Sequence, residues 1–391
     1  MNDTIQSAMY KLHIVGPTNI GGNETLTTKD YLYNYDAGEV YLLNQREWFA
    51  YLYKHKAVPS FEQYVTQEMT QPKGRGMYQW AVDTLGKHNV TRQHLGNAVS
   101  SMMKANRCAE NRKNSLNDII PHIRCIDGTI YTPGSSIKGM IDTAIIEFLI
   151  QTDHRFKRNI QQACHQLLQA YQNRDNRAQG RALRDVDSVI RKRMQCIPDG
   201  NNRINGAISS IFRGISISDA MPIDSITTEV LQKIDHGVGR DAVNDVSVWR
   251  EYILPGNELE FSITLDTSIT QHVGIHSLEE VLTIIEQSQQ RTRKLLKQSF
   301  KNIPSSVWQQ GSTANAYLGG NTGFLHKTII MAAFEDNPAT GTDVIKAILS
   351  KQFDDHEHNI QDRVISPRML KLTRWRNELW EVGGVRIERI K

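Results

Sequence analysis

The stretch YLGGNTGFLHKTII combines glycines with a Lys and a Thr, the residue types of a phosphate-binding loop. A nucleotide P-loop needs a glycine directly before the Lys, but His326 stands there and Gly323 lies four positions ahead of Lys327. The dinucleotide pattern G-x-G-x-x-G fails too, because Gly319, Gly320 and Gly323 give G-G-x-x-G. We therefore predict no nucleotide site. What remains is a flexible glycine-rich turn followed by basic residues such as Lys327, and the simplest interpretation is an ordinary turn.

A second candidate for anion binding is TPGSSIKGMIDTAIIEFLIQ, which is typical of a turn that opens a helix. Ser135 or Ser136 is predicted to cap the helix N-terminus. The helix dipole favours anions there, and Lys138 lies one turn further on. Simple capping and contact with an RNA backbone are both compatible with these residues.

Further cations stand in runs or beside aromatic residues. Arg213 lies in SSIFRGISISDA, which reads as a strand, and is a candidate for phosphate or base contact. Arg291, Arg293 and Lys294 begin the basic half of an amphipathic helix, and Arg368 precedes an aromatic, basic segment. The alternative for each is a solvated surface without function.

Residues for catalysis are sparse. His13 is a candidate general base for metal-free RNA cleavage, but it lacks a convincing partner set and is more typical of a strand histidine. Asp30 and Asp36 follow the first strand without a clear catalytic pattern, and DDHEH at 354–358 reads as a surface loop. From these residues we assign no catalytic residue, no metal site and no cofactor.

Composition sets the wider limits. The chain has 391 residues with a net charge of +4, long enough for two or three domains but too weakly basic to prove a nucleic-acid partner. Its four cysteines form no C-x-x-C, which suits a reducing compartment. No signal peptide or transmembrane run is evident, so we expect a cytoplasmic protein without a membrane partner.

The elements that must position these residues alternate between strands and helices. YKLHIVG and GNELEFSITLD show the two-residue period of half-buried strands, and residues 276–300 form an amphipathic helix. Residues 60–120 read as helical and basic, and residues 155–193 as a solvated helical insertion. The order predicts an α+β fold of two units, each an antiparallel sheet with helices on one face.

Five fragments occur in an order that resembles the RAMP proteins of CRISPR systems: HIVGPTNIGG, TPGSSIKGMIDTAI, SIFRGISISDA, EYILPGNELEFSITLD and LGGNTGFLHKT. With this length, the order is most similar to the subunit of type III-A (Csm) effector complexes that caps the 3′ end of the guide RNA. The resemblance implies two ferredoxin-like (RRM-type) domains, residues 1–234 and 235–391, with helical insertions at about 60–120 and 153–200.

The resemblance also implies RNA binding without catalysis. The expected partners are guide RNA, target RNA, a backbone RAMP subunit, a small helical subunit and host nucleases that trim the guide. RNA contacts are expected at Gly21, Gly22, Ser135, Ser136, Lys138, Arg213, Arg291, Arg293, Lys294, Gly319, Gly320, Gly323, Lys327 and Arg368.

Two alternatives stay within the RAMP group. One is a metal-independent endoribonuclease that processes precursor guide RNA, with a histidine such as His13 as its base. The other is a capping subunit of a type III-B complex.

Overall fold

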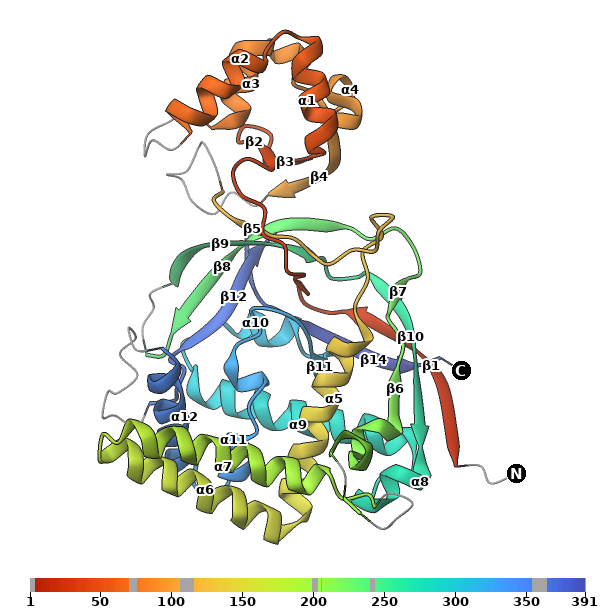
Figure 1. Ribbon diagram of the computed structural model, residues 1–391, viewed down its shortest axis with the longest axis vertical. Coiled ribbons are helices and arrows are strands. Elements are labelled where there is room, and N and C mark those ends of the chain that lie inside the picture. Colours follow the sequence, from red (N-terminus) through yellow and green to blue (C-terminus); the bar gives the residue numbers. More distant parts are fainter. Residues whose placement is uncertain are drawn as a thin grey trace.

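Two β-sheets surrounded by helices make up the computed structural model of the protein (Figure 1). The structure describes residues 4–69, 76–105, 116–198, 203–204, 206–239, 243–353 and 364–390. Helices and strands are mixed along the chain, which confirms the predicted α+β class. Within the described ranges, no helix is both long enough and apolar enough to cross a membrane.

The first sheet, called sheet A, is built around the N-terminal strand. β1 pairs on one side with β10 and on the other with β14, both antiparallel. Its inner face buries Tyr10, Leu12 and Ile14, as the alternating sequence predicts. The strands of sheet A are β1 (Ile5–Ile14), β6 (Ile215–Ile217), β7 (Met221–Pro222), β10 (Glu258–Asp266), β11 (Ala316–Tyr317) and β14 (Gly384–Arg389).

The second sheet, called sheet B, has the long strand β8 at its centre. β8 pairs antiparallel with β9 and β12, and parallel with the end of β4. Its strands are β2 (Tyr31–Asn34), β3 (Glu39–Leu43), β4 (Val99–Ala105), β5 (Ile119–Ile120), β8 (Thr228–Gly237), β9 (Val243–Ile253), β12 (Met369–Trp375) and β13 (Glu378–Glu381).

Most of the helices cover the inner face of sheet A and share its core. Apolar residues of α5, α6, α9 and α12 join those of β1 and β10 in one large buried cluster. The helices of this part are α5 (Gly134–Thr152), α6 (His154–Gln172), α7 (Asn176–Met194), α8 (Thr267–Thr270), α9 (Leu278–Ser299), α10 (Ser305–Gln310), α11 (Ile330–Ala333) and α12 (Pro338–Gln352). The segment predicted as helical near residues 153–200 forms α6 and α7, while its role as an insertion into a domain stays a prediction.

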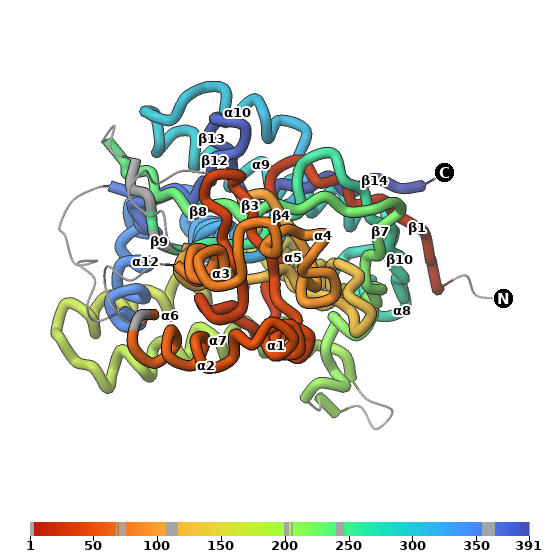
Figure 2. The backbone as a smooth tube through the Cα atoms, turned by 90° about the horizontal axis from the view of Figure 1, so that it is seen from above, coloured from red at the N-terminus to blue at the C-terminus, as the bar shows by residue number. Residues whose placement is uncertain are grey.

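A separate small core lies at the opposite end of the molecule from α6 and α7 (Figure 1). Here Trp48, Trp80 and Phe61 pack against Leu32 and Leu43 of sheet B. We call this part the helical module; it consists of α1 (Gln45–Lys54), α2 (Val58–Gln63), a π-helical turn (Tyr64–Glu68), α3 (Met77–Leu85) and α4 (Arg92–Leu95). Viewed from above, it lies over the rest of the chain (Figure 2).

Two local expectations change. The predicted strand around Arg213 begins only at Ile215, because residues Ile211–Gly214 form a short 3-10 turn. Of the predicted helical stretch 60–120, the described residues up to 98 hold helices, whereas β4 occupies Val99–Ala105. The division at 234/235 stays a prediction; that position falls inside β8, and both sheets take strands from both sides of it.

The start of α5 also differs from expectation. Pro133, not Ser135 or Ser136, is the N-cap residue, and the serines make no side-chain cap. The Gly134 amide instead donates to Oδ1 of Asp219 at 2.7 Å. A side chain at Gly134 would lie 2.5 Å from the carbonyl oxygen of Ile217, so the glycine permits a tight approach of helix and strand. The motif at this helix start therefore has a packing role.

Candidate RNA-binding groove

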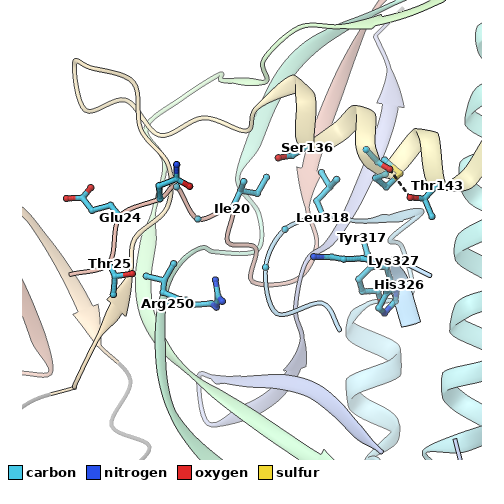
Figure 3. Close-up of a pocket in the computed structure, with 18 residues that line it drawn as sticks. Ile20, Glu24, Thr25, Ser136, Thr143, Arg250, Tyr317, Leu318, His326 and Lys327 are labelled. Carbon is cyan, nitrogen blue, oxygen red and sulfur yellow. Dashed lines mark hydrogen bonds between the residues drawn. The ribbon is translucent and has the colours of Figure 1, made fainter. Parts of the chain in front are cut away.

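A groove of about 560 Å³ lies where the two glycine-rich loops meet the start of α5 (Figure 3). One wall is the loop of residues 20–25 with Ile120, and the other is α5. The floor combines β9, the loop after β11 and the residues before α11. The lining residues are Ile20, Gly21, Gly22, Asn23, Glu24, Thr25, Ile120, Ser136, Gly139, Met140, Thr143, Arg250, Tyr317, Leu318, Gly319, Gly320, His326 and Lys327.

Asn19 holds the parts of the groove together. Its fully buried side chain donates from Nδ2 to the carbonyl oxygen of Glu251 at 2.7 Å and accepts from Nη1 of Arg250 at 2.9 Å. Its own carbonyl oxygen accepts the Gly320 N–H at 2.7 Å. One residue thus connects the first loop, β9 and the second loop, which fixes the position of Arg250.

The glycines of the second loop are required by close packing within the chain. Gly319 has φ +91°, and a Cβ there would lie 2.1 Å from the carbonyl oxygen of Asn19. A Cβ on Gly320 would lie 2.7 Å from Nη1 of Arg250. Any side chain at these positions would therefore push the loop off Asn19 or displace Arg250. The glycines shape the groove by letting two loops touch.

Arg250 and Lys327 are the cations of the groove. They come from opposite sides of the second loop and point toward each other in Figure 3. Neither forms an ion pair with a carboxylate in the part of the chain that the structure describes. Burial lowers the pKa of Lys327, and the nearby charge of Arg250 lowers it further. Arg250 and Lys327 repel each other and lie beside the loop backbone. An anion bound between them would offset this repulsion and stabilise the site.

Two stacked aromatic rings, Tyr317 and His326, lie beside Lys327 in the groove. The ring of His326 stacks on that of Tyr317 at 4.0 Å between centroids. Burial, with the charges of Lys327 and Arg293, lowers the pKa of His326 to about 3. Burial also raises the pKa of Tyr317. Both rings are therefore uncharged at neutral pH, and Lys327 carries the charge at this end of the groove.

Because the folded state disfavours protonated His326, the unfolded chain binds more protons there below its ordinary pKa of 6.5. The free energy of unfolding should therefore fall as the pH drops below 6.5 toward about 3.

Replacing His326 with Phe keeps the ring stacked on Tyr317 and removes the titrating group. We expect the variant to lose about 3 kcal/mol less than the parent between neutral pH and about pH 4. Urea unfolding at a series of pH values measures this, with His272→Phe, at an exposed histidine, as the matched control. Parallel curves for parent and His326→Phe would contradict the assignment.

Six of the predicted contact residues line this one groove. They come from three distant parts of the sequence: Gly21, Gly22, Ser136, Gly319, Gly320 and Lys327. Ser135 is exposed beside it. Lys138 instead donates from Nζ to the carbonyl oxygen of Ile215 at 2.8 Å, and Gly323, with φ +92°, lies against Lys371.

The other predicted cations lie elsewhere. Arg291 pairs with buried Glu147 at 3.0 Å, and Arg293 pairs with buried Glu381 at 3.2 Å. Lys294 lines a second pocket of about 190 Å³ between α5, α9 and α11. Arg213 is exposed at the end of its 3-10 turn, and Arg368 is half-buried before β12. Their roles as RNA contacts stay predictions.

The sequence analysis did not predict Asn19, Arg250 or the ion pair between Arg124 and Glu251 as parts of the site. Glu251 is fully buried and accepts from Nη1 of Arg124 at 2.8 Å, from Oγ1 of Thr228 at 2.9 Å and from the His122 amide at 2.9 Å. The only local sign of this arrangement in the sequence was the adjacent Arg250 and Glu251 near the end of a strand in VSVWREYILPG. Because side chains alternate along a strand, these two point to opposite faces.

The histidine and acidic candidates lie outside the groove lining. His13 stands on the outer face of sheet A, with Nδ1 2.8 Å from Glu258 and Nε2 3.2 Å from Glu388. Asp30 accepts from the amide and hydroxyl of Thr27, so it stabilises a turn. The DDHEH segment lies outside the described residues. Among the residues that the structure describes, no cluster of His, Cys, Asp and Glu side chains could hold a metal ion.

Comparison with known proteins agrees with this architecture. Csm5 of Mycobacterium tuberculosis, a protein of its CRISPR system, is 23% identical over 401 residues, covering 98% of this chain and 97% of the relative. Csm5 of Streptococcus thermophilus is 22% identical over 338 residues, covering 85% and 83%. No protein-family model matches the chain.

Two solved structures share the fold. A chain in the cryo-EM structure of a type III-A Csm–crRNA–target RNA complex has a TM-score of 0.64 at 16% identity, covering 98% of this chain and all of the other. The crystal structure of T. onnurineus Csm5 has a TM-score of 0.58 at 14% identity, covering 96% and 99%.

The two sheets and the helices packed on them give this chain an α+β fold, which it shares with these two solved structures. In sequence, the similarity covers 97% and 83% of the two Csm5 relatives. The resemblance to the Csm5 subunit of type III-A CRISPR systems, indicated by the motif order, is therefore confirmed.

Proposed function

We propose that this chain is the Csm5-type subunit of a type III-A CRISPR effector complex, and that it binds the 3′ region of the guide RNA without cleaving it. The similarity to Csm5 proteins and to a chain in an RNA-containing Csm complex supports the assignment to an effector. The observation that carries RNA binding is the groove, where Arg250 and Lys327, which have no carboxylate partner among the described residues, lie beside the glycine-rich loops.

The groove suits a sugar–phosphate backbone better than a nucleotide. Its cations lie beside glycine loops, and no P-loop spacing is present to wrap a triphosphate. Arg250 is held by Asn19, so its guanidinium is already oriented for a phosphate oxygen. Contacts to phosphate position an RNA without reading its sequence, as a subunit that holds many different guides requires.

The partners that we propose follow from binding of the guide RNA at its 3′ region. A subunit at the 3′ region would contact guide RNA, the target RNA paired with it, a backbone RAMP subunit and the small helical subunit. It would also influence trimming of the guide by host nucleases. Reconstitution without this chain should give a shortened or misassembled complex with altered guide ends. An unchanged complex with an unchanged guide would contradict the capping role.

A non-catalytic role predicts intact RNA. His13 is held between two carboxylates and lies outside the groove, so we expect no general-base catalysis by it. Labelled repeat RNA incubated with the purified chain in EDTA should stay uncut, and His13→Ala should bind and leave RNA as the parent does. Specific cleavage that His13→Ala abolishes would instead establish the endoribonuclease alternative.

A further inference from the structure

The helical module carries two large aromatic side chains that its own core leaves in solvent. On α1, Tyr53 is 81% exposed and Phe49 is 46% exposed. The two lie four residues apart and therefore on the same side of the helix. Arg46 and Ala50 extend this side, and both are exposed. We call Arg46, Phe49, Ala50 and Tyr53 the α1 stripe.

Packing inside the module does not account for these rings. Trp48 and Leu52, on the other side of α1, are fully buried and supply its core contacts. Phe49 touches Phe61 edge-on at 5.7 Å, yet nearly half of it remains exposed. Exposed aromatic rings of this size on a surface generally mark a binding site.

Cations stand at both ends of the stripe, with Glu47 as the one carboxylate on α1 itself. Arg46 stands at one end of it, and exposed Lys54 and Lys56 stand at the other. The structure shows none of these three in an ion pair within the described ranges, unlike the cations of sheet A, where Lys11 pairs with Glu258. The ends of the stripe, Arg46 and Tyr53, are about 10 Å apart along α1.

We propose that the α1 stripe is a stacking platform for single-stranded RNA outside the groove. Phe49 and Tyr53 would stack on unpaired bases, while Arg46, Lys54 and Lys56 would contact the flanking phosphates. Aromatic rings between free cations are the residue types that hold single strands without sequence preference. This inference rests on the proposed RNA-binding function and extends the RNA path to the helical module.

A protein partner fits the stripe less well. A ten-residue helix is about 15 Å long, whereas a stable protein interface covers about 800 Å² on each side. The stripe offers two rings and one small residue, enough for one or two bases. A docked protein helix would instead require apolar contacts at further turns.

The test compares two RNA lengths on the full chain, by fluorescence anisotropy with labelled oligouridine and oligoadenosine. Oligonucleotides of about 6 nucleotides occupy the groove alone, and those of about 20 reach beyond it. Phe49→Ala with Tyr53→Ala should weaken binding of the long RNA about tenfold or more and leave the short RNA unaffected. Phe353→Ala, at an equally exposed phenylalanine, is the matched control and should change neither.

Conservative variants separate stacking from mere apolar contact. Tyr53→Trp should keep long-RNA affinity, whereas Tyr53→Leu should lose it as Tyr53→Ala does, because stacking needs a ring. Long-RNA affinity equal to that of the parent in the double variant would overturn the inference. The same holds if only incorporation into the effector complex is lost, since that indicates a protein partner. If instead groove variants leave short-RNA binding intact, the proposed groove function fails while the stripe result stands.

Discussion

Replacing both Arg250 and Lys327 with Ala should weaken binding of single-stranded RNA about 100-fold at physiological salt. Charge-assisted contacts to phosphate contribute about 1.5–3 kcal/mol each, and this variant removes both cations of the groove at once. Neither side chain belongs to a hydrophobic core, and Asn19 keeps its bond to the Glu251 carbonyl, so the fold should tolerate the change. Because two phosphate contacts disappear, the slope of log affinity against log salt should become shallower by about 1.4.

The control for this prediction is a pair of cations outside the groove. Arg181→Ala with Lys351→Ala removes the same charge from exposed positions on α7 and α12 that are not among the predicted contacts. We expect a small, uniform loss of affinity from long-range electrostatics and a nearly unchanged salt slope. If both pairs reduce affinity and slope alike, RNA binding is diffuse and the groove is not its site.

Replacing Glu251 with Ala should lower the free energy of unfolding by about 3–5 kcal/mol, because it leaves a largely buried guanidinium without its counter-charge. The Glu251 side chain is fully buried, and that of Arg124 is only 23% exposed. The amide of His122 and the hydroxyl of Thr228 would also lose their acceptor. Urea unfolding, followed by circular dichroism, measures the change.

The matching control is Glu62→Ala on the exposed surface of α2, which should stay within about 0.5 kcal/mol of the parent. Glu251→Gln keeps the shape and one acceptor, so its cost should lie between the two. Asn19 bonds to the backbone carbonyl of residue 251, which alanine retains, so this contact should survive in Glu251→Ala. A Glu251→Ala protein as stable as the Glu62→Ala control would contradict the role of this ion pair.

The sequence predicted those parts of the site that depend on local pattern. The glycine pairs Gly21–Gly22 and Gly319–Gly320 can each be recognised from the local sequence alone. The order of the motifs along the chain suggested that both pairs belong to one binding surface. The structure places them in one groove. The same local pattern gave the class of fold, because the two-residue periods of β1 and β10 are strong.

Features that depend on distant partners could not be predicted. The basic run of α9 has the pattern of a free cationic face, yet Arg291 pairs with Glu147, 144 residues away, and Arg293 pairs with Glu381, 88 residues away. The helix start of α5 has two serines, but a carboxylate 85 residues away supplies its acceptor. Arg250 reads as an ordinary strand residue until Asn19 is placed beside it.

The most direct test of the central claim is photocrosslinking in a reconstituted effector complex. The guide RNA carries one photoreactive thiouridine at a chosen position, and crosslinked peptides are identified by mass spectrometry. Our account predicts that nucleotides of the 3′ region crosslink to peptides covering residues 19–25 and 317–327, and that the crosslinks disappear in the Arg250→Ala, Lys327→Ala variant. Crosslinks from the 3′ region that avoid both loops, or that persist unchanged in the variant, would contradict it.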